Sequence, residues 1–406
     1  MGEKKILNLH ARDFKAETRA AHAGLDPHAN SGIVNPPVYH ASTVLFENLD
    51  ALADADRNPF TVVNYGRIGT PTSHAFESAV AELEGGYRAI TAASGLAAIT
   101  TALFAVTRAG DHLLITDSVY APTRRFCNET LAGYGIEVEY FPPTLDADGL
   151  KARIKPNTVA LYLESPGSLT FEIQDVPALS AVAKAAGLTV LLDNTWATPL
   201  YFKPFRHGVD VSIHAATKYL VGHSDAMLGV MVARDAETYQ TFKKAAVRFG
   251  TCGGPDDVYL ALRGIRTLGV RLRRHQETAV QLAIWLSHRP EVARVLHPAL
   301  ASDPGHALWR RDFTGSSGLF AMELHPCSRP ALAAMVDGMS LFGIGYSWGG
   351  YESLILPTDP RSVRTAAAWN TAGPLVRLHA GLEDPDDLIA DLDAGFARLA
   401  AVQHAS

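Results

Sequence analysis

Short apolar stretches alternate with helical patterns between about residue 65 and residue 255. The apolar stretches have the length of strands and lack a regular polar face, at 112–117, 138–141, 158–164, 188–193 and 209–214. Strands that are apolar on both faces are typical of a parallel sheet covered by helices. A helical pattern at 95–108, which follows the capping residue Ser94, precedes the first of them, and others, such as 178–187, lie between them. The pattern therefore predicts a doubly wound α/β domain.

The two flanks of this domain have different patterns. The first 64 residues show little periodicity, and Pro36-Pro37 favours an extended path, so we expect an arm at 1–64. Near residue 255 the alternation stops, and a long helical stretch runs from Val258 to about Ser287. Strands near 318–324 and 374–382 and a helix at 385–401 follow. We therefore expect a cofactor-binding domain at 65–257 and a smaller α+β domain at 258–406.

Composition narrows the class of protein. The chain has 406 residues, of which 47% are hydrophobic, so it can bury a large core. A net charge of −6 argues against nucleic acid as a general partner. The basic stretch 263–274 carries five arginines, which we interpret as a solvated or subunit-facing side of a helix rather than a nucleic-acid patch.

Cysteine usage and hydropathy predict a cytoplasmic protein. The three cysteines, Cys127, Cys252 and Cys327, are far apart and show no CxxC spacing. No apolar run approaches the roughly 20 residues that span a bilayer. The 16 histidines show no HExxH-type spacing. We therefore expect no disulfide framework, no metal site and no membrane partner.

Polar residues follow several of the predicted strands. Tyr120 follows one strand, Asp193 ends another, and Thr217 and Lys218 follow a third. Upstream, Ser94 precedes Gly95 and Leu96 at the start of a predicted helix. Ligands of an open parallel sheet bind beyond the carboxyl ends of its strands, so these residues can converge although they are distant in sequence.

Each of these residue types suits one part of pyridoxal 5′-phosphate. Free amides at a helix start, beside a glycine, bind phosphate. A carboxylate such as Asp193 can keep the pyridine nitrogen protonated. Tyr120 can stack on the ring. An amine such as Lys218 can form a Schiff base, and burial lowers the pKa of such an amine toward that of a useful base.

The sequence resembles the pyridoxal-phosphate-dependent family of cysteine and methionine metabolism over nearly its whole length. The similar segments are YGRIGTPT (65–72), AELEGG (81–86), LESPGSLTFEI (163–173), DNTWA (193–197), AATKYLVGHSDAMLG (215–229), RGIRTLGVRLR (263–273), RDFTGSSGLF (311–320), YSWGGYESL (346–354) and RLHAGLEDPDDLIADL (377–392). The resemblance implies the fold-type-I fold of pyridoxal-phosphate-dependent transferases.

The resemblance also implies a role for individual residues. Lys218 matches the Schiff-base lysine and proton shuttle, Asp193 the partner of the pyridine nitrogen, and Tyr120 the stacking tyrosine, which could also act as a base. The remaining matches are Gly95, Leu96 and Thr217 at the phosphate, Tyr65 and Arg67 at the phosphate of a neighbouring subunit, and Ser347, Trp348 and Arg377 at the substrate carboxylate. A homotetramer is implied as well. A guanidinium fork fits phosphate or carboxylate in bidentate fashion, which agrees with both arginine roles.

Three departures from the wider family favour its bacterial β-lyase branch. Ala215 replaces the usual serine three positions before the lysine, so one phosphate hydrogen bond should be missing. Gly167-Ser168 and Ala121-Pro122 stand where γ-acting relatives tend to differ. The branch acts on amino-acid thioethers, and the resemblance implies β-elimination of L-cystathionine to homocysteine, pyruvate and ammonia, in methionine biosynthesis. A γ-acting lyase or synthase and a broad cysteine-S-conjugate β-lyase are the alternatives.

Other classes of protein fit less well. A nicotinamide dehydrogenase needs G-x-G-x-x-G between its first strand and helix, and the sequence has no such segment there. A serine hydrolase needs G-x-S-x-G, whereas residues 222–226 read GHSDA. A regulatory binding module could dispense with the lysine or the carboxylate grip, but Lys218, Asp193 and Arg377 are all present. We therefore expect an enzyme.

Overall fold

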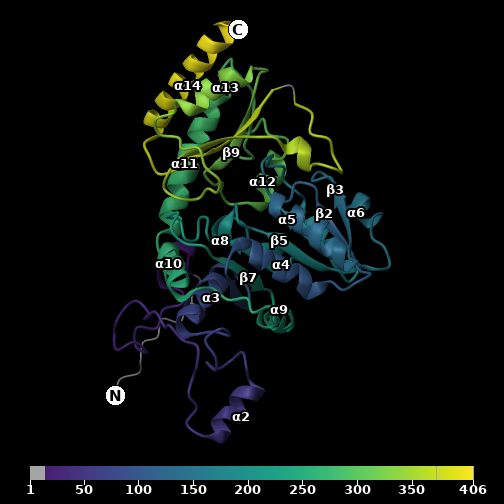
Figure 1. Cartoon of the computed structure of the whole chain (residues 1–406), viewed down its shortest axis with the longest axis vertical. Helices are drawn as coiled ribbons and strands as arrows, with labels where there is room; N and C mark the ends of the chain where they lie inside the picture. The colour runs from purple at the N-terminus through teal and green to yellow at the C-terminus, as the bar shows by residue number, and fades with distance from the viewer. Residues whose placement is uncertain (1–13, 372, 406) are drawn as a thin grey trace.

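The structure, a computed structural model, describes residues 14–371 and 373–405. Its strands form two separate sheets, a seven-stranded sheet in the middle of the chain and a four-stranded sheet nearer the C-terminus. Figure 1 shows the helix α14 at one end of the molecule and α2 at the other, with the larger sheet between them. This arrangement confirms the expected α/β fold with a smaller C-terminal α+β part.

The larger sheet has the strand order β1-β7-β6-β5-β4-β2-β3. Its strands are β1 (Arg88–Ala92), β2 (His112–Thr116), β3 (Glu137–Phe141), β4 (Thr158–Glu164), β5 (Thr189–Asp193), β6 (Val211–Ala215) and β7 (Gly229–Ala233). Neighbours from β6 to β3 are parallel, while β7 runs antiparallel to both β6 and β1. The five strands predicted from sequence are therefore confirmed, and β1 and β7 are additional.

The helices follow the alternation of the sequence. They are α1 (Ala16–His22), α2 (Leu49–Arg57), α3 (Pro71–Glu84), α4 (Gly95–Val106), α5 (Ala121–Arg125), α6 (Ala147–Lys151), α7 (Val176–Ala185), α8 (Thr198–Tyr201), α9 (Ala236–Phe249), α10 (Pro255–Ile265), α11 (Leu268–Leu286), α12 (His306–Asp312), α13 (Arg329–Asp337) and α14 (Pro385–Ala405). Ser94 caps α4 as predicted, because its side chain accepts a hydrogen bond from Ala97 N.

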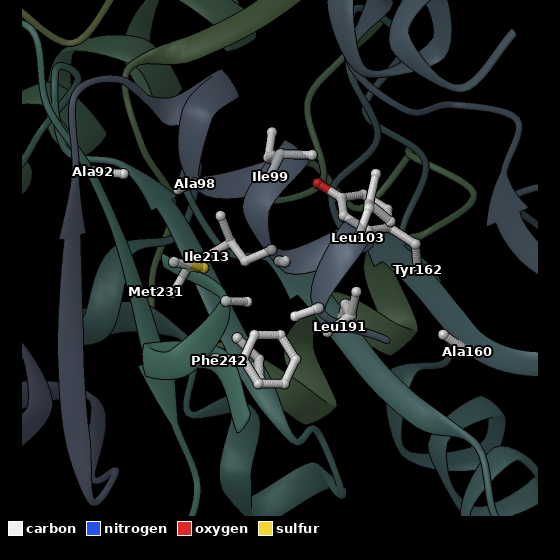
Figure 2. Close-up of a cluster of buried hydrophobic side chains, with 14 of the residues drawn as sticks. Ala92, Ala98, Ile99, Leu103, Ala160, Tyr162, Leu191, Ile213, Met231 and Phe242 are labelled. Atoms are coloured by element: carbon white, nitrogen blue, oxygen red, sulfur yellow. The ribbon is translucent and has the colours of Figure 1, made fainter. Parts of the chain in front are cut away.

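Successive residues of the parallel strands pack on opposite faces of the sheet. Leu191 belongs to a core shared with α4 and α9, whereas Val190 and Leu192 belong to a core shared with α7. Figure 2 shows the first of these cores, in which Ile99 and Leu103 of α4 lie over the sheet. Burial on both faces explains why the inner strands β2, β4 and β5 are apolar between their ends.

The smaller sheet is antiparallel, in the order β10-β11-β9-β8. Its strands are β8 (Val292–Leu296), β9 (Leu319–Leu324), β10 (Leu354–Thr358) and β11 (Leu375–His379). The helices α11, α13 and α14 contribute to one apolar core with these strands. Other residues of these strands, among them Leu319, Ala321 and Leu375, belong instead to the core that the larger sheet shares with α7.

Two details of the C-terminal part differ from the sequence analysis. The predicted long helix is divided into α10 and α11, because Thr267 leaves the helical conformation at φ −107° and ψ 5°. The basic stretch is not a solvated face throughout. Arg271 is buried and donates to Tyr219 O and Gly264 O, while Arg266 donates to Ala20 O and Ala23 O. These arginines join α10 and α11 to neighbouring segments.

The N-terminal segment from Phe14 to residue 64 contains two short helices and is otherwise irregular. A single bridge joins Thr43 to Tyr65. Large apolar side chains are exposed along it, among them Ile33, Val34, Leu45 and Leu49. Figure 1 shows α2 at the end of the molecule opposite α14, away from both sheets.

Candidate active site

Lys218 lies in the turn that follows β6. Its backbone N–H donates to Ala215 O at 3.0 Å, and its carbonyl accepts from Gly222 N at 2.8 Å. Its amine donates to the Ser347 hydroxyl and lies 5.2 Å from the centre of the Trp348 ring. Burial, together with the nearby Arg377 and against the influence of Asp193, lowers the pKa of this amine to about 8. At pH 7 about a tenth of the amine is therefore neutral, and so nucleophilic, far more than for an ordinary lysine.

Asp193 ends β5 and is buried. Its Oδ1 accepts hydrogen bonds from the Thr195 N–H at 3.0 Å and the Thr195 hydroxyl at 2.5 Å. Burial raises the pKa of Asp193, outweighing the opposite influence of Thr195, His214 and Lys218. Since Thr195 holds Oδ1, the other carboxylate oxygen can serve a cationic ligand, whose charge would offset the cost of burial.

Tyr120 lies just before α5, beyond the end of β2. Its backbone N–H donates to Oε2 of Glu164, the last residue of β4, at 2.8 Å. Burial raises the pKa of the phenol, with contributions from Glu164 and Asp193, while Arg377 opposes them. The phenol is therefore protonated at neutral pH. These mutual influences place Tyr120 in the same electrostatic environment as Asp193 and Arg377.

The N-terminus of α4 lies against the turn that carries Lys218. A Cβ atom on Gly95 would come within 2.5 Å of the Ala215 Cβ and 2.9 Å of its Cα, so glycine is required for this approach. The amides of Gly95 and Leu96 precede the first hydrogen bonds of the helix and are available to an anion. The Thr217 hydroxyl contacts Leu228, accepting from its N–H at 2.9 Å and donating to its carbonyl at 3.2 Å. A phosphate would have to compete for this hydroxyl.

Arg377 comes from the smaller sheet, in the middle of β11. Its Nη2 donates to Ser347 O at 3.0 Å and Gly345 O at 3.3 Å. Burial lowers the pKa of the guanidinium. Among the described residues no carboxylate forms an ion pair with it. A buried guanidinium that lacks such a carboxylate partner is suited to bind a carboxylate supplied by a ligand.

The structure thus brings most of the predicted residues to one place. Lys218 contacts Ser347 and Trp348, and Ser347 contacts Arg377, which joins the two sheets at the site. Tyr65 and Arg67 lie elsewhere within this chain. Arg67 donates to Val247 O at 2.8 Å and lies over the Tyr65 ring at 5.7 Å. Their role across a subunit interface stays a prediction.

Three residues at the site were missed in the sequence analysis. Thr195 holds Asp193, Glu164 holds the backbone of Tyr120, and His379 holds the loop that carries Ser347. Thr195 could have been found, since a hydroxyl residue two positions after an aspartate commonly bonds to it. The other two act across long sequence separations, and nothing local identifies them.

The described part of the chain contains neither a candidate metal site nor a candidate membrane-spanning helix. No group of three or more histidine, cysteine or acidic side chains could hold a metal ion within residues 14–371 and 373–405. No helix in these ranges has the length and apolar character needed to cross a membrane.

The fold and the site together define a class, the pyridoxal-phosphate enzymes. The site offers an amine of lowered pKa, a buried carboxylate next to it, and free amides at a helix start that closely approaches the same turn. These match the aldehyde, the pyridine nitrogen and the phosphate of the cofactor. The chain belongs to the Cys/Met metabolism PLP-dependent enzyme family, whose sequence model matches residues 17–397.

Individual relatives cover nearly the whole chain. A cystathionine β-lyase of Escherichia coli strain K12 is 44% identical over 95% of this chain and 99% of its own length. An L-alanine/L-glutamate racemase of Wolbachia pipientis wMel is 42% identical over 95% of this chain and 98% of its own. Among solved structures, a cystathionine γ-synthase of Xanthomonas oryzae pv. oryzae superposes with a TM-score of 0.89 at 34% identity, covering 96% of this chain and 100% of that one.

Proposed function

We propose that this enzyme is a pyridoxal-phosphate-dependent carbon–sulfur lyase that converts L-cystathionine to homocysteine, pyruvate and ammonia in methionine biosynthesis. One observation carries the proposal: the Lys218 amine, with its pKa lowered to about 8, contacts Ser347 at the junction of the two sheets and is within electrostatic reach of the buried Asp193 and of Arg377, for which the described residues provide no ion-pair partner. The similarity to the cystathionine β-lyase of Escherichia coli supports cystathionine as the substrate of this site.

The substrate is held by its α-carboxylate. The Arg377 fork binds both carboxylate oxygens, and Ser347 and Trp348 line the same place. The Lys218 amine, when free, removes the proton from Cα, and its contact with the Ser347 hydroxyl keeps it oriented for that step. Loss of the Cα proton is followed by departure of homocysteine thiolate from Cβ. The aminoacrylate left behind hydrolyses to pyruvate and ammonia.

Pyridoxal phosphate would be held by Lys218 at rest and, when joined to the substrate amine in place of that lysine, would supply an electron sink for the negative charge that develops at Cα. Asp193 would hold the pyridine nitrogen in its protonated form, and Thr195 fixes that carboxylate. Gly95, Leu96 and Thr217 would hold the phosphate, with Ala215 contributing no hydroxyl. Tyr120, protonated at neutral pH, is better suited to cover the ring than to act as a base.

Elimination at Cβ requires one proton to be taken from the substrate, whereas chemistry at Cγ requires a second, from Cβ. Ala121, Pro122 and Gly167 carry no acid or base. Gly167 is so close to Ser118 that a Cβ atom would come within 2.5 Å of its side chain, and Ser168 N donates to Ser118 O at 2.8 Å. These positions therefore serve local packing and supply no group that could take the second proton. Their composition favours β-elimination over chemistry at Cγ.

The phosphate site is proposed to be completed by Tyr65 and Arg67 of a second copy, within a homotetramer. The exposed apolar side chains of residues 31–49 support an interface there. Mixing inactive Arg67→Ala and inactive Lys218→Ala proteins under subunit exchange should restore part of the activity. If hybrids form, as mass spectrometry can verify, and none is active, Arg67 does not act across the interface.

We also propose that the chain divides into three parts. Residues 1–64 would form the oligomer-contacting arm, 65–257 the cofactor-binding domain and 258–406 the domain that grips the substrate carboxylate. We also place the reaction in the cytoplasm, where the three cysteines would remain thiols.

Racemisation is a second candidate, favoured by the 42% identity with the racemase. A base that removes the Cα proton starts both reactions, and they differ in whether a group then leaves Cβ or a proton returns on the other face. L-Alanine and L-glutamate lack a good leaving group at Cβ, so a lyase would turn them over poorly.

Product identification separates the candidates. The enzyme is incubated with L-cystathionine, and separately with L-alanine and L-glutamate, and the products are identified by chiral chromatography and mass spectrometry. We expect homocysteine and pyruvate in equal amounts. Cysteine with 2-oxobutyrate would indicate a γ-lyase, incorporation of an added thiol would indicate a synthase, and D-alanine or D-glutamate at a higher kcat/KM than that for cystathionine would indicate a racemase.

A further inference from the structure

The loop from Gly345 to Glu352 carries Ser347 to the Lys218 amine in a strained conformation. Ser347 has a φ of +72° and Gly349 a φ of +91°. A serine rarely adopts a positive φ, and such a conformation persists only where the surroundings enforce it. A Cβ atom on Gly349 would come within 3.0 Å of the Lys218 backbone, so the loop lies directly on the lysine's own chain.

Two side chains of β11 hold this loop. Arg377 donates to the carbonyls of Gly345 and Ser347. His379, two residues further along β11, accepts from Gly349 N at 3.1 Å through Nε2 and contacts Glu352 O at 3.1 Å through Nδ1. Residues two apart in a strand point to the same face, which explains how both side chains reach one loop.

The partners of His379 fix its protonation. A carbonyl oxygen can only accept, so the contact with Glu352 O requires the proton on Nδ1, while the Gly349 N–H requires a lone pair on Nε2. The ring is therefore neutral. Burial lowers the pKa of His379 well below its ordinary value, and the nearby His275, Arg377 and Lys218 act in the same direction.

We infer that His379 is a positioning residue, whose neutral ring holds the 345–352 loop so that the Ser347 hydroxyl meets the Lys218 amine. The inference rests on the proposed function for what that contact does, since Lys218 is taken there as the base. The hydrogen bonds that define the positioning exist without any substrate.

A packing role for the ring has to be distinguished from this positioning role. His379 belongs to a buried aromatic group, with its ring centre 5.2 Å from His275 and 6.0 Å from Tyr219. His275 offers a matched control. It is equally buried, and its Nδ1 contacts Ala380 O at 2.8 Å, outside the 345–352 loop. A variant at His275 perturbs the same aromatic group without removing an acceptor from Gly349.

Three variants separate the two roles. In His379→Gln the side-chain oxygen reaches the place of Nε2 and can still accept from Gly349 N. In His379→Asn the shorter amide reaches only the place of Nδ1, so Gly349 N loses its acceptor. His275→Asn keeps a donor for Ala380 O. Thermal unfolding of all three holoenzymes shows whether each is folded.

The first measurement is hydrogen–deuterium exchange of the peptides that cover residues 345–352, in the holoenzyme without substrate. Loss of one buried hydrogen bond should speed exchange there by about tenfold in His379→Asn. His379→Gln and His275→Asn should stay within about threefold of wild type, which is a difference smaller than one such bond produces.

The second measurement is kcat/KM with whichever amino acid the enzyme turns over. We expect a fall of about tenfold in His379→Asn, again the effect of one hydrogen bond, with recovery in His379→Gln. Equal exchange in His379→Asn and His275→Asn would overturn the inference, as would a glutamine variant as impaired as the asparagine variant. Exchange is measured without substrate, so its result stands even if cystathionine proves not to be the substrate.

Discussion

The cofactor side and the substrate side of the site are built in different ways. On the cofactor side, Asp193 and Lys218 follow the neighbouring parallel strands β5 and β6 and are held by short-range bonds, from Thr195 and to Ala215. On the substrate side, Ser347 lies on a strained loop and depends on Arg377 and His379 of another strand. The first set is positioned within its own sheet, whereas the second depends on contacts between the loop and β11.

This difference has a functional consequence. The Lys218 amine and the Ser347 hydroxyl lie on opposite sides of the boundary between the two sheets, 129 positions apart in sequence. Any loosening between the sheets should disturb the substrate side while the cofactor side remains in place. Variants and pH changes can therefore be sorted by which side they affect.

Removal of Lys218 should have the largest effect, because both sides meet at its amine. Lys218→Ala loses the covalent link to the cofactor and the base, so turnover should fall by at least about a thousandfold. Absorbance of the bound cofactor and steady-state turnover measure the two losses, and thermal unfolding serves as the control for folding. Turnover close to that of wild type would refute the assignment of Lys218.

Acid should destabilise the C-terminal part of the fold through two of its buried histidines, His275 and His297. Burial lowers the pKa of His275 to about 4 and that of His297 to about 4, from 6.5. Unfolded histidine binds a proton below pH 6.5 and the folded residue does not until about pH 4, so the free energy of unfolding falls as the pH drops through this window. At pH 5 each residue should cost about 2 kcal/mol.

Urea unfolding at pH 7.5 and pH 5, at one protein concentration, measures this loss. His275→Asn cannot bind the proton, so its difference in unfolding free energy between the two pH values should be smaller by about 2 kcal/mol. An unchanged difference would show that His275 is not the titrating group.

Arg377 should matter less for the fold and more for the substrate. Arg377→Ala removes the charged hydrogen bonds to the substrate carboxylate, each contributing about 1.5–3 kcal/mol, so kcat/KM should fall at least about tenfold. Arg377→Lys keeps the charge without the fork and should lie between alanine and wild type. Cofactor absorbance should be unchanged. Loss of cofactor with normal substrate affinity would show that Arg377 serves the cofactor and not the substrate.

The same comparison explains what could be predicted from sequence. The strands β2, β4 and β5 are continuous apolar runs between their ends, and β3 and β6 are mostly apolar. The residues that follow these parallel strands lie at one edge of the sheet by topology alone, so Asp193 and Lys218 could be found. The strands β1 and β7 also form this sheet but were missed, since their short apolar runs at 88–92 and 229–233 stand outside the regular alternation. The break between α10 and α11 was missed because the apolar periodicity continues across it.

The substrate side was found through resemblance alone. Nothing in the local sequence indicates that His379 accepts a hydrogen bond from the backbone of Gly349, 30 positions earlier, and so holds the loop that carries Ser347. A positive φ at a serine contradicts its local preference and results from tertiary contacts. Such residues become visible only when the fold is known.

Glu164 allows the finest test of the cofactor side. It is the register partner of Asp193 on the adjacent strand, so two carboxyl groups lie side by side on one face of the sheet. Burial raises the pKa of Glu164 well above its ordinary value, and Asp193 raises it further, against the opposing Tyr120 N–H and Arg364. Asp193 accepts two hydrogen bonds from Thr195, which favours the charge on Asp193 and the proton on Glu164.

A protonated carboxyl at Glu164 can be replaced by an amide of the same shape. Glu164→Gln keeps an oxygen for the Tyr120 N–H and should retain kcat/KM within about threefold, whereas Glu164→Ala removes that acceptor and should lower kcat/KM by about tenfold. Steady-state kinetics at pH 7.5 measures both, and Glu137→Gln, a change at an exposed ion pair, provides the control. If glutamine lowers kcat/KM as much as alanine does, Glu164 is ionised and shares with Asp193 the protonated pyridine nitrogen. The two carboxylates would then form one site.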